Sequence, residues 1–534
     1  MQIAINLLGG LGLFLYGMNM MGDGLQKSAG DQLKKIIGFL TSNVVMGVLV
    51  GTVVTGIIQS SSATTVMVVG FVNAGIMTLS QAIGVIMGAN IGTTVTAQLV
   101  SFSLEDIAPI ALGIGIIVYL AAKNQKHKQY AEILLGFGML FTGMEFMKNA
   151  VNPLADLPEF RDALILVGSR PLLGILVGFL ITGIVQSSSA SMGMLIALAS
   201  QGILPLSAAL PILYGDNIGT CVTSLLSSLG ASKNAKRAAF MHLTFNVIGT
   251  ILFIVVFTKP ITMIVGYLDP SNVARQIANA HTLFNVVNVI VLLPFSKYIV
   301  KLVLKLIPVT EDEEEADEVQ YIDDRMIETP SIAVGNAILE VREMANYASK
   351  SLMYAVEGVL NYSEEEMDKT FAMEKKVNEI QKQLLAFLVK LSKGSLNEDE
   401  RNKVTNLIYA VNDIERISDH GENIAELGKS LIEDKLTFSE HAQNEIREIY
   451  TLALNNFKDS MECLEEINLD LRKKVHENEK RVDLLEIGYR NHHMQRLNEG
   501  RCTVDAGVIY FDILTNLERV SDHSKNIADY SYDV

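Results

Sequence analysis

The chain has 534 residues and a formal net charge of −16, and 49% of its residues are hydrophobic. Residues 1–308 carry 17 Lys/Arg and 11 Asp/Glu, whereas residues 309–534 carry 26 and 48. A weakly basic, apolar half followed by a strongly acidic half predicts an integral membrane domain with a soluble appendage. Nucleic-acid binding is excluded as a function class, because the soluble half is acidic throughout.

The cysteines and the N-terminus further limit the kinds of site and the targeting signals that the chain can contain. Cys221, Cys463 and Cys502 are far apart and odd in number, which argues against a disulfide framework or a thiolate zinc site. The N-terminus lacks the basic start and the small-residue cleavage site of a signal peptide, so residues 1–21 are expected to be retained as a span or half-span.

The membrane half contains many apolar segments, several of them shorter than the roughly 20 residues of a full span. They lie at 2–21, 39–58, 63–79, 82–104, 107–122, 130–148, 163–185, 189–204, 207–230, 238–258 and 276–305. Several are interrupted by Gly, Asn, Ser and Thr, which is typical of discontinuous helices around a binding site. We expect an all-α domain with eight to ten full spans and two re-entrant hairpins.

Two polar motifs occur twice within these apolar segments. The first copy has Gln-Ser-Ser-Ser at 59–62 and Gly-Ala-Asn-Ile-Gly-Thr at 88–93. The second copy has Gln-Ser-Ser-Ser at 186–189 and Gly-Asp-Asn-Ile-Gly-Thr at 215–220. Both motifs are shifted by the same 127 residues, which indicates a duplicated unit. We expect repeat 1 over about 1–122 and repeat 2 over about 130–308.

Basic loops indicate the orientation of the chain. The cluster of Lys123, Lys126 and Lys128 lies between the repeats, and lysines at 297, 301 and 305 end the last span. The positive-inside rule places such loops in the cytoplasm. The chain is therefore predicted to be a multi-pass protein of the cell membrane with a cytoplasmic C-terminal domain.

The Gln-Ser-Ser-Ser motif concentrates neutral hydrogen-bonding groups where unsatisfied polar groups are costly. Hydroxyl and amide oxygens suit a hard cation such as sodium, and the free N–H groups of a restarting helix suit an oxyanion. Neither motif contains Lys or Arg. An anion bound there would need co-bound cations, which makes coupling obligatory. The alternative is that the small residues only let helices approach closely; the duplication favours the binding site.

Other polar residues of the membrane half each have two possible roles. Asp216 replaces Ala89 at the equivalent position, and an intramembrane carboxylate is a candidate cation ligand or proton acceptor, or else a helix N-cap. The repeat His-x-x-Phe-Asn, at 242–246 and 281–285, could supply oxygen ligands, although hydrogen bonds between helices account for it more simply.

The soluble half is also duplicated. Residues 309–328 are highly acidic and are expected to be a solvated linker. From 329 to 534, long segments with helical apolar spacing and little Gly or Pro predict a bundle of two three-helix repeats. The stretch at 413–426 matches that at 516–529, with a Glu-Arg-x-Ser-Asp-His core shifted by 103 residues. His420 and His523, in these cores, are expected to be surface or helix-cap residues.

Carboxylates in these motifs are spaced four apart and so share a helix face. They form the pairs Glu415/Asp419, Glu518/Asp522 and Glu479/Asp483, and Glu374 precedes Asn378. Such like-charge pairs need a positive partner. Arg416 and Arg519 could provide it in a solvated ion-pair face, or an oxygen-preferring metal ion could bind there.

At its duplicated motifs the membrane half resembles the type II sodium–phosphate cotransporter family. The resemblance covers about residues 1–305 and implies inverted repeats, serine-rich re-entrant hairpins, and transport of inorganic phosphate with sodium as the coupling ion. Carried over by motif, it implies that the phosphate and sodium sites are shaped by Gln59, Ser60, Ser61, Ser62, Gln186, Ser187, Ser188 and Ser189, with Asn90, Thr93, Asn217 and Thr220 beside them. Thr64 and Asp216 are further candidate binding residues, and Asp216 departs from the family pattern, which has a small residue at that position. The resemblance also hints at a homodimer in the lipid membrane, and it leaves the transport direction open.

The second half, over roughly 330–534, resembles PhoU-like domains at its duplicated Glu-Arg-x-Ser-Asp-His motifs. Such domains regulate phosphate uptake and can hold metal clusters on these motifs. The tentative metal ligands are Glu374, Glu415, Asp419, Glu479, Asp483, Glu518 and Asp522, with the metal unidentified. No nucleophile–base pair or phosphate-cradling loop indicates an enzyme. Alternatives to a sodium-coupled phosphate transporter are a phosphate sensor or scaffold that binds without transporting, and a transporter or exporter of another oxyanion.

Overall fold

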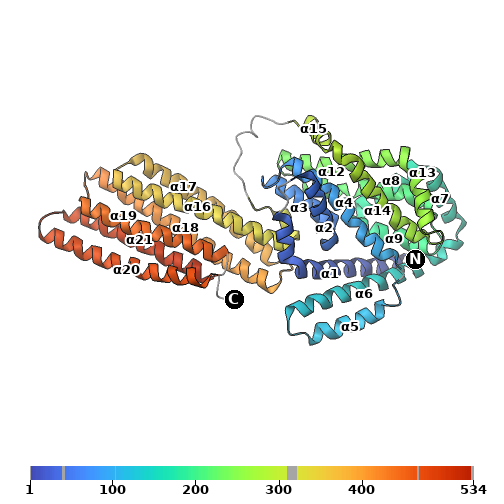
Figure 1. Cartoon of the computed structure of the whole chain (residues 1–534), viewed down its shortest axis with the longest axis horizontal. Coiled ribbons are helices and arrows are strands. Elements are labelled where there is room, and N and C mark those ends of the chain that lie inside the picture. Colours follow the sequence, from blue (N-terminus) through green and yellow to red (C-terminus); the bar gives the residue numbers. More distant parts are fainter. Residues whose placement is uncertain (1, 39–42, 103, 309–320, 466–467, 531–534) are drawn as a thin grey trace. The chain divides into compact units, whose positions relative to one another are not determined.

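The computed structural model describes residues 2–38, 43–102, 104–308, 321–465 and 468–530, and every regular element in these ranges is a helix. The predicted all-α fold is therefore confirmed for this part of the chain. The chain divides into two compact units, Met1–Ile332 and Ala333–Val534 (Figure 1). Most of the predicted linker lies outside the described residues, and its last part, 321–328, belongs to the first unit.

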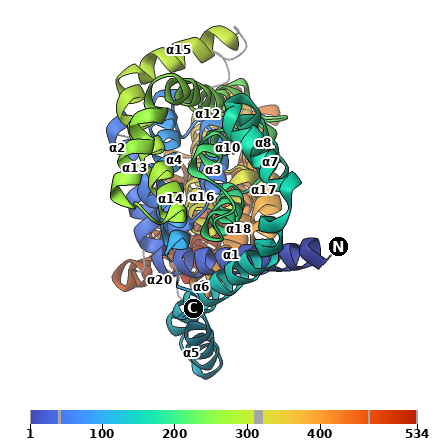
Figure 2. The same cartoon turned by 90° about the vertical axis from the view of Figure 1, so that its right-hand side faces the viewer.

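In its described residues, the first unit contains the helices α1 to α15 and four short turns of 3-10 or π helix. In chain order the helices are α1 (Gln2–Gly38), α2 (Val44–Ile58), α3 (Ser61–Asn73), α4 (Leu79–Ser101), α5 (Ala108–Ala121), α6 (Gln125–Val151), α7 (Pro158–Ser169), α8 (Pro171–Val185), α9 (Ser188–Ser200), α10 (Leu206–Gly219), α11 (Cys221–Ser227), α12 (Lys233–Leu252), α13 (Thr258–Leu268), α14 (Val273–Leu292) and α15 (Ser296–Leu306). The turns are η2 (Asn152–Asp156), η3 (Phe253–Phe257), η4 (Leu293–Phe295) and η6 (Asp324–Glu328). Helix α6 packs between α1 and α5 (Figures 1 and 2).

Within the described residues, five helical stretches are long and apolar enough to cross a membrane, or six if the bent pair α7–α8 is one span. They are Gln2–Ala29, Leu79–Ser101, Gln125–Leu154, Lys233–Leu268 and Val273–Leu306. This is fewer than the eight to ten spans expected from the sequence. The difference arises because helices such as α2 and α3 have only 15 and 13 residues and are separated by a sharp turn.

That turn carries the Gln-Ser-Ser-Ser motif, and it has the same conformation in α2–α3 and in α8–α9. The glutamine ends the first helix in the left-handed region, with φ 59° at Gln59 and 55° at Gln186. Positive φ is uncommon for residues other than glycine. The next residue, Ser60 or Ser187, is extended and caps the second helix by accepting a hydrogen bond from the N–H three residues later, at 3.1 and 3.2 Å. The duplication seen in the sequence is thus a duplication of backbone geometry.

The Gly-x-Asn-Ile-Gly motifs pack α4 against α2 in the first repeat and α10 against α8 in the second. A Cβ atom on Gly88 would lie 2.1 Å from the Val48 carbonyl oxygen, and a Cβ atom on Gly215 would lie 2.0 Å from that of Ile175. Only glycine permits these approaches of α4 to α2 and of α10 to α8, a packing typical of small residues in membrane bundles. Both contacts obey the shift of 127 residues.

The second unit is a bundle of long helices with polar outer faces. Its helices are α16 (Pro330–Asn361, which starts just before the unit boundary), α17 (Glu364–Ser392), α18 (Glu398–Glu433), α19 (Glu440–Glu465), α20 (Leu469–Asn498) and α21 (Val504–Tyr530). On α18 the apolar residues Ile414, Ile417, Ile424 and Leu431 recur at helical spacing and are fully buried.

The two halves of this bundle are joined by reciprocal hydrogen bonds between the duplicated motifs. His523 Nδ1 lies 2.6 Å from Asp413 Oδ1, and His420 Nδ1 lies 2.8 Å from Asn516 Oδ1. The two histidine rings lie 5.5 Å apart between centroids. These histidines, expected at the surface or at helix caps, therefore connect α18 to α21.

Candidate functional site

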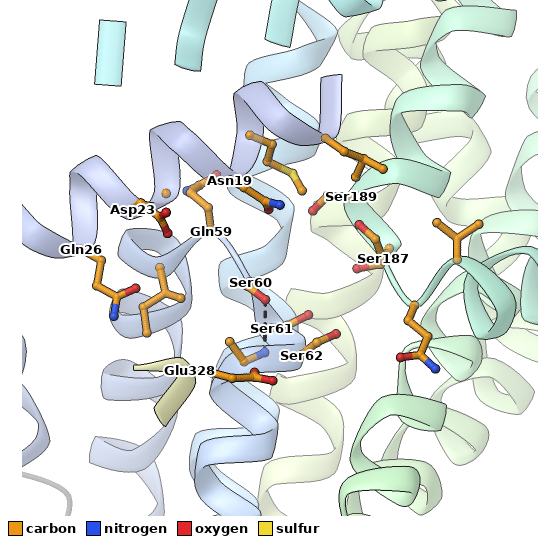
Figure 3. Close-up of a pocket in the computed structure, with 18 residues that line it drawn as sticks. Asn19, Asp23, Gln26, Gln59, Ser60, Ser61, Ser62, Ser187, Ser189 and Glu328 are labelled. Atoms are coloured by element: carbon orange, nitrogen blue, oxygen red, sulfur yellow. Dashed lines mark hydrogen bonds between the residues drawn. The ribbon is translucent and has the colours of Figure 1, made fainter. Parts of the chain in front are cut away.

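Both Gln-Ser-Ser-Ser turns open into one cavity of about 510 Å³ in the first unit (Figure 3). Its lining comes from α1, from the α2–α3 turn, from the α8–α9 turn and from η6. The lining residues are Leu15, Met18, Asn19, Gly22, Asp23, Gln26, Ile58, Gln59, Ser60, Ser61, Ser62, Ala63, Val185, Gln186, Ser187, Ser188, Ser189 and Glu328. The structure thus brings together residues that are 127 positions apart in the sequence.

The N-termini of two helices face this cavity. Helix α3 begins at Ser61 and helix α9 begins at Ser188, and both residues line the cavity while being less than 8% exposed. A helix N-terminus carries a partial positive charge and free N–H groups, which favour an anion. The hydroxyl oxygens beside them can accept a cation. The arrangement can therefore hold an oxyanion and a cation side by side.

The described residues that line the cavity include no Lys or Arg, but they include two carboxylates, Asp23 and Glu328. Figure 3 shows Asp23 on α1 near Gln59, and Glu328 below Ser61 and Ser62. Burial raises the pKa of Glu328 above its ordinary value. An anion entering this cavity would meet negative rather than positive side chains, so its charge would need other compensation.

Three predicted residues of the first repeat lie outside the cavity lining. Thr64 bonds to the Thr55 hydroxyl at 2.9 Å and to the Ser60 carbonyl oxygen at 3.1 Å, which braces the turn. Asn90 donates to the carbonyl oxygen of Ile86 at 2.9 Å, and the Thr93 hydroxyl donates to that of Ala89 at 3.1 Å. Both side chains are buried in α4 and are bonded to their own helix.

The equivalent residues of the second repeat behave in the same way. Asn217 donates to the Leu213 carbonyl oxygen at 2.9 Å, and Thr220 donates to that of Asp216 at 3.0 Å. The Asp216 carboxylate is fully buried and accepts a hydrogen bond from the Thr182 hydroxyl of α8. It does not lie among the residues that line the cavity.

The two glutamines differ although their backbones match. Gln59 is 7% exposed, and its side-chain oxygen accepts a 2.9 Å hydrogen bond from the Thr96 hydroxyl of α4. The equivalent pair is Gln186 and Thr223. Gln186 is exposed, and the buried Thr223 hydroxyl has no hydrogen-bond partner among the described residues. The first turn is thus fastened to its neighbouring helix and the second is not.

Sequence reasoning missed the contribution of α1. Asn19, Asp23 and Gln26 line the cavity from one face of this helix. The repeat comparison could not find them, since the positions 127 residues later hold Phe146, Ala150 and Pro153. The available signal was the spacing of three polar residues, 19, 23 and 26, on one face of an apolar helix.

The duplicated His-x-x-Phe-Asn motifs are buried in α12 and α14 and do not line the cavity. The ring of His242 lies 3.1 Å from the Ser224 hydroxyl, and Asn246 donates to the sulfur of Cys221 at 3.3 Å. Both contacts join α12 to α11. The motif in α12 therefore makes hydrogen bonds between helices, which was the simpler of the two roles considered for it.

In the second unit, six carboxylates, five of them predicted ligands, form two groups of three in which one oxygen of each member lies within 4.8 Å of the others. The groups are Glu374, Asp419 and Glu422, and Glu479, Asp483 and Asp522. Glu422 was not among the predicted ligands, and Glu415 and Glu518 belong to neither group. Burial, and then the negative charges of Glu422 and Asp419, raise the pKa of Glu374.

The predicted ion-pair partners are also present. Arg416 lies 3.2 Å from Asp419 and 3.8 Å from Glu415, and Arg519 makes the equivalent contacts at 3.7 and 3.6 Å. Lys525 additionally hydrogen-bonds to Glu479. Arginine thus bridges both duplicated Glu-x-x-x-Asp pairs, and the bridged Asp419 and Asp522 are also members of the two three-carboxylate groups.

Sequence profiles of two families match the chain. The Na+/Pi-cotransporter profile matches residues 13–149 and 153–268, and the PhoU domain profile matches residues 341–428 and 446–531. No solved structure matches the chain.

Curated relatives include the "Putative inorganic phosphate export protein YjbB" of Salmonella typhimurium, which is 23% identical over 534 residues, or 99% of this chain and 97% of the relative. The "Uncharacterized protein YqeW" of Bacillus subtilis is 32% identical over 258 residues, or 48% of this chain and 83% of the relative. The "Sodium-dependent phosphate transport protein 2A" of Rattus norvegicus is 37% identical over 115 residues, or 20% of this chain and 17% of the relative. The chain therefore belongs to the Na+/Pi-cotransporter family of phosphate transporters and carries a C-terminal PhoU domain.

Proposed function

We propose that this protein moves inorganic phosphate across the cell membrane together with sodium ions, and that its PhoU domain is a cytoplasmic regulator. The observation that carries the proposal is the meeting of both Gln-Ser-Ser-Ser turns in one cavity whose described lining lacks Lys and Arg. Desolvating a phosphate anion without a cationic partner is very costly. Helix N-termini offset only part of this cost, and sodium bound to hydroxyl and carboxylate oxygens supplies the rest.

The roles of the cavity residues follow from their chemistry. The hydroxyls and N–H groups at the starts of α3 and α9 bind phosphate, and Asp23, with the glutamine and serine oxygens, binds sodium. Asp216, one helix away, is a candidate second cation ligand or proton acceptor. The residues Thr64, Asn90, Thr93, Asn217 and Thr220 support this arrangement by holding the turns and helices in place.

The direct test is the flux of labelled phosphate into proteoliposomes with and without a sodium gradient. Sodium-dependent flux supports the proposal, whereas flux that is unchanged by sodium removal contradicts the coupling. Binding of phosphate without flux would identify a sensor or scaffold instead. Competition by sulfate or arsenate against labelled phosphate would show whether another oxyanion is the preferred substrate.

Phosphate export is the second candidate function, because a relative that matches nearly the whole chain is named a putative inorganic phosphate export protein. A coupled carrier runs in the direction set by its gradients. Measuring flux from both faces of oriented vesicles distinguishes import from export. Export is supported if phosphate loaded on the cytoplasmic side leaves faster than external phosphate enters under the same gradient.

We also propose that the two acidic groups of the PhoU domain hold oxygen-preferring cations. Support comes from three carboxylate oxygens within 4.8 Å in each group. Elemental analysis of the purified protein, compared with a Glu374→Gln/Glu479→Gln variant, tests this proposal. Equal metal content in both proteins would favour the ion-pair alternative, which the arginine bridges already satisfy.

A further inference from the structure

We propose that residues 323–328 form a latch that holds the Glu328 carboxylate in the cavity, where it competes with the phosphate anion. The inference rests on the proposed phosphate site. It assigns a ligand-site residue outside the part of the chain that matches the cotransporter profile, which ends at residue 268. It also names the element through which the C-terminal half acts on the cavity.

The latch is fixed by polar contacts at one end. The Asp323 carboxylate is 7% exposed and accepts a 2.7 Å hydrogen bond from Asn73, the last residue of α3. Arg325 donates to the Ser227 carbonyl oxygen at 2.7 Å and pairs with Asp323 at 2.6 Å. The segment is thereby joined to α3 and to the end of α11.

Apolar packing holds its centre. Met326 is fully buried, and a Cβ atom on Gly70 would lie 3.5 Å from its side chain. Gly70 belongs to α3, the helix whose first turn forms the proposed phosphate site. The centre of the latch therefore packs directly on the helix that carries the proposed phosphate site.

The other end of the latch reaches the site itself. Glu328 lines the same cavity as Ser61, Ser62 and Ser188 (Figure 3). A carboxylate has two acceptor oxygens and a negative charge, so it resembles the anion that the helix N-termini favour. Its charge repels a phosphate in the same cavity, and an interaction between like charges in a partly buried site is screened only in part.

The connection to the PhoU domain is short. Helix α16 starts at Pro330, two residues after Glu328. A displacement of α16 that pulled on the latch would withdraw the carboxylate and free the site. The latched state is therefore the low-affinity state, and release of the latch produces the high-affinity state.

Equilibrium binding of labelled inorganic phosphate to the full-length protein in sodium buffer tests the latch. Glu328→Gln keeps the shape and removes the charge, so it should lower the phosphate Kd about fivefold. Glu159→Gln, which removes a charge at an exposed residue of α7 outside both the latch and the cavity lining, should leave the Kd unchanged. Wild-type protein that binds no phosphate would refute the proposed function rather than the latch.

The variant Arg325→Gln distinguishes release of the latch from a change in local charge alone. Removing a positive charge should weaken phosphate binding if only charge matters, but releasing Glu328 should strengthen it. We expect a lower Kd for Arg325→Gln, and no further decrease when it is combined with Glu328→Gln. An unchanged or higher phosphate Kd for Glu328→Gln overturns the inference. The inference also fails if the variant needs a higher sodium concentration than wild type for phosphate binding, because Glu328 would then be a cation ligand.

Discussion

The side-chain oxygen of Gln59 accepts a 2.9 Å hydrogen bond from Thr96, whereas the equivalent pair in the second repeat, Gln186 and Thr223, is not joined. Two turns with the same backbone thus differ in how they are held. The first turn is fixed to α4, and the second glutamine faces the cavity without this restraint.

Thr96→Val removes the hydroxyl that holds Gln59 and keeps the side-chain shape. One hydrogen bond contributes about 1 kcal/mol net, so we expect the phosphate Kd to rise about fivefold in an equilibrium binding assay. The matched control is Thr223→Val, which removes a hydroxyl without a partner and should leave the Kd within twofold. An equal effect of both substitutions would contradict the distinction between the turns.

Ser61→Ala and Ser188→Ala remove a hydroxyl from each helix start that faces the cavity. Hydrogen bonds to charged groups contribute about 1.5–3 kcal/mol, so each variant should lose at least tenfold in the rate of sodium-dependent phosphate flux at low phosphate concentration. Ser200→Ala, at the opposite end of α9 and outside the cavity lining, is the control. Activity that survives both replacements would show that phosphate binds elsewhere.

The two serine turns could be predicted from the sequence because they recur with one fixed shift, and helix packing alone rarely places a polar tetrapeptide within an apolar segment. The sequence could not show whether Gly88 and Gly215 serve ligand binding or helix packing. Glycine suits a close approach to a ligand and a close approach to a helix equally well. The structure shows the second, because a Cβ atom added at either glycine would lie only 2.1 or 2.0 Å from a carbonyl oxygen of the neighbouring helix.

The position of Glu328 in the cavity could not be predicted from the local composition. Glu328 follows a run of acidic residues, and such runs are usually solvated, so the linker prediction extended over it. Its place in the cavity depends on Met326 and Asp323 docking on α3, contacts between residues about 250 positions apart in the chain. Asp23 escaped notice for another reason, since its repeat equivalent is Ala150.

Truncation after residue 308 removes both the latch and the PhoU domain. If the domain is a regulator, the truncated protein should still transport phosphate with sodium, and its flux at low phosphate concentration should exceed that of the full chain. Flux in proteoliposomes, normalised to inserted protein, measures this. A truncated protein that cannot be purified as a folded species would show that residues 309–534 are needed for the fold of the membrane half, and would contradict a purely regulatory role.

The pairing of Glu445 predicts how the PhoU domain responds to acid. Burial alone would raise the pKa of Glu445, but hydrogen bonds from Arg496, Tyr510 and His492 outweigh burial and lower it. Because the folded-state pKa lies below the ordinary value of about 4.3, the pairing stabilises the fold above that pH. The contribution is lost as the pH falls through the lowered pKa.

Glu445→Gln should therefore reduce the free energy of local opening around α19 by about 2 kcal/mol at pH 7, as expected when the charged acceptor of hydrogen bonds in a partly buried site is removed. Hydrogen exchange of the full-length protein measures this, and the difference from wild type should shrink below about pH 4. Glu499→Gln, whose side chain is 40% exposed beside Arg501, should change it by less than about 0.5 kcal/mol. Equal losses in both variants would contradict the assignment.

The central claim is that phosphate rests among neutral hydroxyls only when sodium accompanies it. Its most direct test is the uptake of labelled phosphate by proteoliposomes in which sodium is replaced by potassium or choline at constant ionic strength. Uptake should fall to the level of protein-free vesicles without sodium and return when sodium is restored. Phosphate uptake at the same rate in all three salts would contradict the claim.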